Sequence, residues 1–187
     1  MLKRYEKFLE EFDKTLLGFF DSQKSFIKCK KGCSICCEIG EYPFSRLEAE
    51  YLMQGFLGLP KEQKDRIREN INSLLEQQKN FEGERFLYQC PFLLNKECAL
   101  YNYRGIVCRV HGLAYIDKNT KYVKLPECVR YGLNYSDVFN TEDDTLSLAN
   151  PIESDLSIFG VLRSSVSQQY QLECGEIRPL INWFKFM

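Results

Sequence analysis

The chain has 187 residues, with 25 Lys and Arg against 26 Asp and Glu and a formal net charge of −1. This near balance argues against nucleic acid as the main partner, because proteins that bind phosphate backbones carry a clear basic excess. Hydrophobic residues make up 44% of the chain, which is enough to form the core of a single domain over residues 1–187.

The sequence has no secretory signal at its start and no apolar stretch that approaches the about 20 residues needed to span a membrane. We therefore expect a cytoplasmic protein without a membrane partner. Nine cysteines stand out in this setting. Because cytoplasmic thiols stay reduced, metal ligation or redox chemistry is favoured over structural disulfides.

Three helices are predicted in the first half of the chain. Hydrophobic residues at steps of three and four predict a helix from residue 2 to about residue 26. Ser45 and Glu48 have the spacing of a capping box, so a second helix is expected to begin there and to end near Gly58. A third helix is predicted over residues 61–80, with its apolar residues on one stripe.

The second half of the chain has a different sequence pattern. Short apolar runs separated by turn residues predict one hairpin within residues 92–100 and a second within 112–125. A helix is expected from Asn150-Pro151 to about residue 170, and a short last helix over 177–184. Together these elements predict a mainly α fold with small β-hairpins (α+β), a single compact helical domain around a cysteine-rich metal centre.

A first cysteine module places four thiols within nine residues, in the spacing C-x3-C-x2-C-C. Soft thiolates select zinc, copper(I) or iron–sulfur clusters over hard cations. The sulfurs converge either on one face of a helix or around a tight knuckle at Gly32. The adjacent pair is expected to diverge and to serve different purposes. The module consists of Cys29, Cys33, Cys36 and Cys37.

A second module spreads over residues 90–128, at spacings that are weak signals by themselves. Eight cysteines in the two modules would suit two four-thiolate zinc sites, or one four-iron cluster with thiols left over. His111, the only histidine, is interpreted as a neighbour of the site or a structural residue more than as a ligand, and Cys174 as a small buried hydrophobe. The second module consists of Cys90, Cys98, Cys108 and Cys128.

The ordered motifs resemble a known family. CKKGCSICC from residue 29, CPFL from residue 90, CALYNYRGIVCR from residue 98 and a late Cys128 are similar to the bacterial and archaeal YkgJ-like (CxxCxxCC) family of zinc- or iron-chelating domains. The resemblance covers residues 29–128 and includes all eight cysteines of the two modules. It also includes Tyr101, Arg104 and Arg109, which are thereby predicted to contact the cofactor. Gly105 departs from the family, which has proline there.

The resemblance implies a cytoplasmic metal-binding protein that holds an iron–sulfur cluster or zinc through its eight cysteines. Two alternatives stay open. One is an iron–sulfur enzyme related to flagellin lysine N-methylase, and the other is a thiol redox or metal-delivery protein. No catalytic residue is assigned, and a protein partner is left open.

Overall fold

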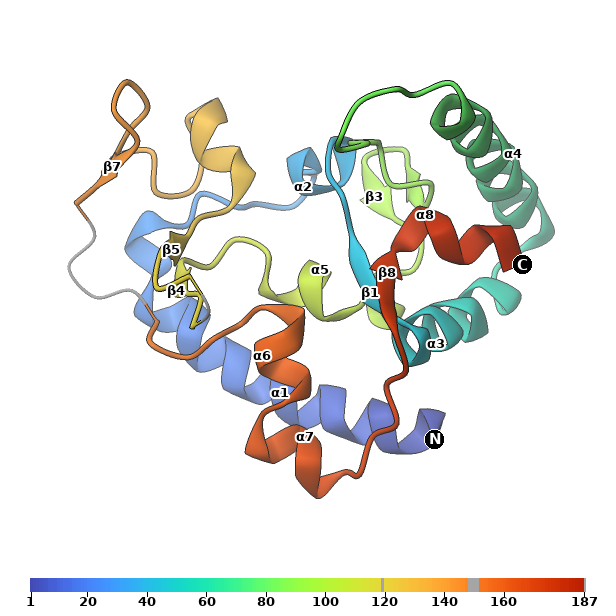
Figure 1. The fold of residues 1–187 in the computed structure, drawn as a ribbon, viewed down its shortest axis with the longest axis horizontal. Helices are drawn as coiled ribbons and strands as arrows, with labels where there is room; N and C mark the ends of the chain where they lie inside the picture. The colour runs from blue at the N-terminus through green and yellow to red at the C-terminus, as the bar shows by residue number, and fades with distance from the viewer. Residues whose placement is uncertain (119, 148–151, 187) are drawn as a thin grey trace. The chain divides into compact units, whose positions relative to one another are not determined.

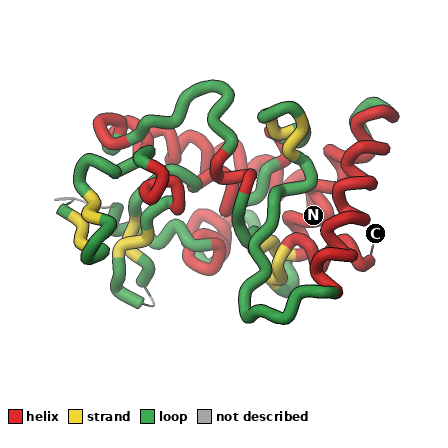
Figure 2. Tube along the Cα trace, turned by 90° about the horizontal axis from the view of Figure 1, so that it is seen from above, coloured by secondary structure: helices red, strands yellow, loops and turns green. Residues whose placement is uncertain are grey.

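The computed structural model describes the chain except residues 119, 148–151 and 187 (Figure 1). It is mostly helical with several small two-stranded antiparallel hairpins, as the sequence predicted, and Figure 2 shows how short the strands are between the loops. The chain divides into two compact units. Unit 1 comprises Met1 with residues 3–31 and 109–172, and unit 2 comprises Leu2 with residues 32–108 and 173–187. The prediction of one domain over the whole chain stays a prediction.

Unit 1 contains the first helix, α1 (Leu2–Ser22), which a short 3-10 turn, η1 (Lys24–Phe26), extends. The predicted helix over residues 2–26 is therefore confirmed. Its apolar face is buried as the periodicity requires: Tyr5 and Phe8 have no exposed surface, and Leu9, Phe12 and Leu16 are nearly as buried.

The remaining elements of unit 1 are short. Ala114, Val129 and Tyr135 form a small core, against which Phe26 and Phe139 pack. The second predicted hairpin is confirmed at reduced length, and a third hairpin follows it that the sequence analysis did not predict. These elements are β4 (Tyr115–Ile116), β5 (Val123–Lys124), η3 (Glu127–Tyr131), β6 (Phe139–Asn140), β7 (Thr145–Leu146), α6 (Ile158–Leu162) and α7 (Ser165–Gln169).

The prediction of one continuous helix up to residue 170 is wrong. Its expected start at Asn150-Pro151 lies outside the described residues. Beyond it, α6 and α7 are separate helices, each begun by a serine whose hydroxyl accepts a backbone hydrogen bond, Ser157 from Gly160 and Ser164 from Ser167. A second N-cap at Ser164 starts a new helix. The apolar residues continue at steps of three and four across this break, so their periodicity alone does not reveal it.

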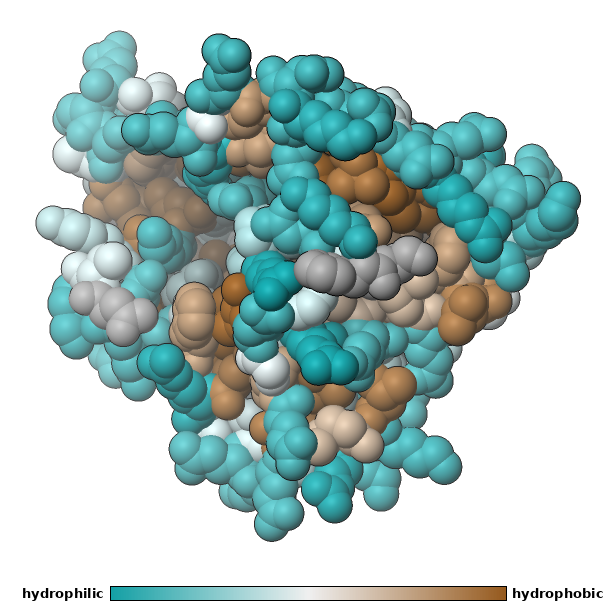
Figure 3. Space-filling view, turned by 45° about the vertical axis from the view of Figure 1, so that its right-hand side comes forward, coloured by the Kyte–Doolittle hydropathy of each residue, from teal (hydrophilic) through white to brown (hydrophobic). Residues whose placement is uncertain are grey.

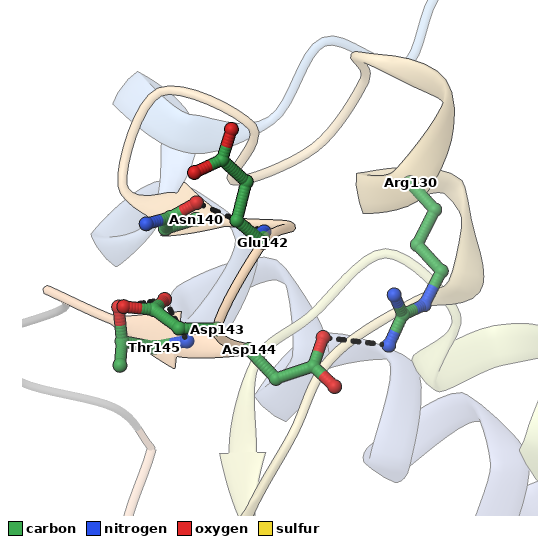
Figure 4. A network of polar contacts seen from close by, with 6 residues as sticks. All are labelled: Arg130, Asn140, Glu142, Asp143, Asp144 and Thr145. Carbon is green, nitrogen blue, oxygen red and sulfur yellow. Dashed lines mark hydrogen bonds and ion pairs between the residues drawn. The ribbon is translucent and has the colours of Figure 1, made fainter.

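The β6–β7 hairpin closes through its own side chains (Figure 4). The carboxylate of Asp143 accepts hydrogen bonds from both the backbone N–H and the hydroxyl of Thr145, which lower the pKa of Asp143. Arg130 on η3 pairs with Asp144 at 2.9 Å. Asp144 itself has φ 54°, a left-handed conformation that aspartate tolerates in turns.

Unit 2 is built around α3 (Arg46–Leu57) and α4 (Lys61–Lys79), which confirm the second and third predicted helices. The capping box is present as predicted: Ser45 accepts from the backbone of Glu48, and Glu48 accepts from the backbone of Ser45. The first predicted hairpin is confirmed, with its turn at Asn95 and Lys96, both at positive φ. The other elements are α2 (Ile35–Glu38), β1 (Pro43–Ser45), β2 (Leu93–Leu94), β3 (Glu97–Cys98), η2 (Tyr101–Tyr103), the first three residues of α5 (Ile106–Val110), β8 (Ile177–Pro179), α8 (Leu180–Trp183) and η4 (Phe184–Phe186).

The end of the chain returns to unit 2 as a strand. β8 pairs antiparallel with β1, and the two lie side by side in Figure 1. The predicted last helix over 177–184 is therefore correct only for α8, because Ile177–Pro179 pair with β1 instead. Trp183 donates its indole N–H to the carbonyl of Phe44 at 2.9 Å, which fixes α8 over the same core.

Among the described residues, no helix is long and apolar enough to cross a bilayer. On the face drawn in Figure 3, hydrophobic residues lie in several areas that hydrophilic residues separate. Such a mixture is ordinary for a folded protein surface, since polar residues cannot cover a whole domain.

Candidate metal centre

The first cysteine module is a turn followed by one turn of helix. Gly32 has φ +87°, a conformation that favours glycine, and α2 begins only at Ile35. Of the two arrangements that the sequence left open, the knuckle at Gly32 is the one adopted. The boundary between the units falls here, so that Cys29 belongs to unit 1 and Cys33, Cys36 and Cys37 to unit 2.

The adjacent thiols of α2 face each other. The Sγ atoms of Cys36 and Cys37 lie 3.9 Å apart, so the expectation that they diverge is wrong. Neighbouring residues of a helix are about 100° apart around its axis, which still allows two side chains to turn toward one side. A separation of 3.9 Å is close to the ~3.8 Å between two sulfurs of a tetrahedral site with metal–sulfur bonds of about 2.3 Å.

Three cysteines of the second module reach the same region of unit 2 by separate routes. The backbone N–H of Cys90 donates to the carbonyl of Cys37 at 2.8 Å. Cys98 ends the β2–β3 hairpin opposite Leu93, and Cys108 lies on α5. Cys90, Cys98 and Cys108 all pack against the main core of unit 2. We call these three and the Cys36–Cys37 pair the five-cysteine group.

The thiols of this group influence one another electrostatically, which reflects their proximity. Burial, together with the charges of Cys98 and Cys36, raises the pKa of Cys90 to about 12. Burial also raises the pKa of Cys98 and, by more, that of Cys108, on which Cys90, Cys98 and Cys36 act in the same direction. Several buried thiolates close to one another are therefore stable only when a positive charge lies nearby.

The Cys36–Cys37 pair releases its protons in coupled steps. The hydrogen bond from Cys37 lowers the pKa of Cys36 to about 7, while the same contact and burial raise the pKa of Cys37 well above its usual value. One thiolate of the pair thus forms readily near neutral pH, and the second does not.

In the metal-free, reduced protein, we expect alkylation of Cys36 by iodoacetamide to increase through a midpoint near pH 7 instead of pH 9. Replacing Cys37 by Ser removes the sulfur contact and should move the midpoint upward. Mass spectrometry of the alkylated peptides measures both rates. Cys174, whose pKa burial raises to about 11, is the internal control. A midpoint near 9 in the unsubstituted chain would contradict the expectation.

Arg104 is a source of positive charge for the five-cysteine group. Its guanidinium opposes the effect of burial on the pKa of Cys98 and of Cys108, and contributes to the lowered pKa of Cys36. The ring of Tyr101 holds it by stacking at 3.5 Å, and the carbonyl of Tyr101 accepts from its Nε at 2.8 Å. The prediction that Arg104 and Tyr101 contact a cofactor stays a prediction.

The other candidates of the second module lie in unit 1. Arg109 is buried and forms an ion pair with Asp13 of α1. Cys128 is buried at the start of η3, and the charges of both Cys128 and Cys29 raise the pKa of Tyr135 beyond the effect of burial. Within the described residues the Nε2 atom of His111 is buried without a hydrogen-bond partner, and burial lowers the pKa of this side chain.

The thiols of the five-cysteine group stand near one another without closing into a coordination shell. In the part of the chain that the structure describes, no group of three or more His, Cys, Asp or Glu side chains is arranged to hold a metal ion.

Comparison with protein-family models, with curated proteins and with solved structures finds no match to this chain.

Glu48 supports the site in a way that the sequence analysis did not predict. Its carboxylate is fully buried and accepts from the backbone N–H of Ile106 at 2.7 Å, at the start of the helix that carries Cys108. Gly105 makes this approach feasible, because a Cβ there would lie 2.8 Å from the ring of Phe44 and 2.9 Å from Glu48 Oε1. Glycine at position 105 therefore has a packing reason. The capping-box motif pointed to Glu48 only as a helix cap.

A groove of about 750 Å³ lies elsewhere in unit 2, along α3 and α8. Met53, Leu57 and Trp183 contribute to its lining, and its lining residues include no cysteine. Its two arginines, Arg46 and Arg178, are each paired with a glutamate. The groove is therefore distinct from the five-cysteine group.

Proposed function

We propose that this chain is a cytoplasmic metal-binding protein whose cysteines hold zinc or an iron–sulfur cluster. The observation that supports the proposal is the five-cysteine group, in which the Sγ atoms of Cys36 and Cys37 lie 3.9 Å apart and the backbone of Cys90 is hydrogen-bonded to Cys37. Cys90, Cys98 and Cys108 pack against the same core. Thiolates are ligands for zinc and iron–sulfur clusters, and both groups favour four of them.

The thiols of the five-cysteine group are donors that suit zinc or an iron–sulfur cluster. Burial makes each isolated thiolate of Cys90, Cys98 and Cys108 unfavourable, and a metal cation reverses this balance by deprotonating the thiols it binds. When bound, zinc supplies a structural crosslink and an iron–sulfur cluster supplies electron transfer. Arg104 would offset part of the remaining negative charge.

Cys29 and Cys128 extend the proposal to unit 1. They lie close enough to Tyr135 for both of their charges to act on its hydroxyl. With Cys33 they complete the eight cysteines that the resemblance assigns to metal binding.

Metal delivery is a second candidate, and the Cys36–Cys37 pair favours it. The pair is only partly buried and supplies one thiolate near neutral pH. Such a thiolate is suited to ligand exchange with another thiol site, because the thiolate is the form that binds metal.

The test is metal analysis of protein purified without oxygen, together with its ultraviolet–visible spectrum. We expect stoichiometric zinc in a colourless protein, or iron with absorbance near ~400 nm from a sulfur-ligated cluster. Cys36→Ser and Cys98→Ser should each lower the bound metal by at least half. Cys174→Ser is the matched control and should retain it, since Cys174 lies in the same unit outside the group.

Unsubstituted protein without either metal would overturn the proposal. So would equal metal content in all three variants, with circular dichroism showing that each is folded.

A further inference from the structure

Asn134 is a fully buried polar residue in unit 1 that lies against Cys29. Its Nδ2 donates to the Sγ of Cys29 at 3.2 Å and to the carbonyl of Gly112 at 3.1 Å. Its Oδ1 accepts from the backbone N–H of Lys28 at 2.8 Å. Both donors and the acceptor of the carboxamide are therefore used, which is the usual condition for burying such a group.

The surrounding backbone is shaped for this contact. Gly112 has φ +105°, and a Cβ at this position would lie 3.1 Å from Asn134 Nδ2 and 3.7 Å from Cys29 Sγ. The next residue, Tyr135, donates its backbone N–H to the carbonyl of Phe26 at 2.9 Å and stacks on the ring of Phe26. Residues 134–135 thus bind the segment just before Cys29 at two points.

In the hydrogen bond between Asn134 and Cys29, the sulfur is the acceptor. A neutral thiol is a weak acceptor, whereas a thiolate accepts hydrogen bonds strongly because it is charged. The Sγ of Cys29 also lies 3.5 Å from Asn134 Oδ1, a contact open only to the protonated thiol. In the shorter of the two contacts the sulfur is the acceptor, and Cys29 is exposed enough for a metal to reach it.

We infer that Asn134 is a positioning residue, which donates a hydrogen bond to the Sγ of Cys29 and orients this sulfur for metal binding. The inference rests on the proposed function, because it assigns Cys29 the role of a ligand. N–H donors to ligating sulfurs orient the ligand and tune the metal, and their loss typically lowers metal affinity by ~10–100-fold. Asn134 lies outside both cysteine modules, so no motif points to it.

The test compares the metal-free full chain with Asn134→Asp, which keeps the shape and the acceptor to Lys28 but removes the donors to Cys29 Sγ and to the Gly112 carbonyl. Because aspartate also adds a negative charge, the neutral variant Asn134→Ser is measured beside it and should show the same weakening. Co²⁺ is the probe, because its thiolate charge-transfer band reports sulfur ligation directly. We expect Asn134→Asp to bind Co²⁺ at least ~10-fold more weakly. Asn140→Asp, an exposed asparagine of the same unit, is the matched control and should match the unsubstituted chain.

A double-mutant cycle with Cys29→Ser separates positioning from a general structural role. If Asn134 acts through the sulfur, its effect on Co²⁺ affinity disappears in the Cys29→Ser background. Where Asn134→Asp does not fold by circular dichroism, Asn134→Ser takes its place in the same cycle.

Two results would overturn the inference. Equal Co²⁺ affinity in the unsubstituted chain and in Asn134→Asp would remove the role of Asn134 and leave the proposed function intact. Absence of any Co²⁺ charge-transfer band in the unsubstituted chain would instead remove the proposed function, and the inference with it.

Discussion

Glu48→Ala should lower the free energy of unfolding by about 3–5 kcal/mol, a large fraction of the stability of an ordinary domain. The carboxylate of Glu48 has no exposed surface and accepts from Ser45 N at 2.8 Å, Ser45 Oγ at 2.7 Å and Ile106 N at 2.7 Å. Without it, buried donors at the starts of α3 and α5 lose their acceptor, and a cavity is left among Phe44 and Gly105. Urea unfolding followed by circular dichroism measures the loss.

Glu50→Ala is the matched control on the same helix. Glu50 forms an exposed ion pair with Arg46 at 2.9 Å, and such pairs contribute less than about 1 kcal/mol. Glu48→Gln retains volume but turns an N–H₂ group toward other donors, so we expect an intermediate loss. Similar losses for Glu48→Ala and Glu50→Ala would show that the buried carboxylate does not join the two helix starts.

The second large effect concerns metal loading, if the proposed function is correct. Saturating the reduced, metal-free chain with Zn²⁺ at a thousandfold excess over its dissociation constant should stabilise it by about 4 kcal/mol. For a chain of this size that corresponds to an increase of ~8–16 °C in the unfolding temperature. Differential scanning calorimetry, with and without the metal, measures the shift.

The location of this stabilisation can be measured as well. Because the five-cysteine group lies within residues 32–108, hydrogen exchange of α2, α5 and the β2–β3 hairpin should slow on adding Zn²⁺. The double variant Cys36→Ser/Cys98→Ser should show no metal-dependent shift, whereas Cys174→Ser should keep it. An unsubstituted chain with the same unfolding temperature at all Zn²⁺ concentrations would contradict the prediction.

Local patterns predicted the elements that local interactions stabilise. α1 and α4 follow from apolar residues at steps of three and four, and α3 begins at Ser45 because its cap and Glu48 are three residues apart. The same reasoning failed where two signals competed. Across Ser164 the apolar period continues, but a serine cap starts a new helix, so one predicted helix is two.

The sequence could name the candidate residues of the site, but it could predict their arrangement in space only in part. The sequence identified the cysteines of both modules and the residues Tyr101 and Arg104. It did not predict that Cys36 and Cys37 face each other, since that depends on side-chain torsions within a single turn of helix. Nor did it predict Asn134, whose carboxamide meets Cys29 through a contact between segments far apart in the chain.

By itself, then, the amino-acid sequence determined the main helices, the hairpin turn at Asn95-Lys96 and the supply of thiols, because each depends on residues within a few positions of one another. The tertiary structure decided the pairing of β1 with β8, the approach of Cys90 to Cys37 and the contact of Glu48 with Ile106. These contacts join distant segments, and they form only where the burial of a shared core brings backbone and side-chain groups within hydrogen-bonding distance.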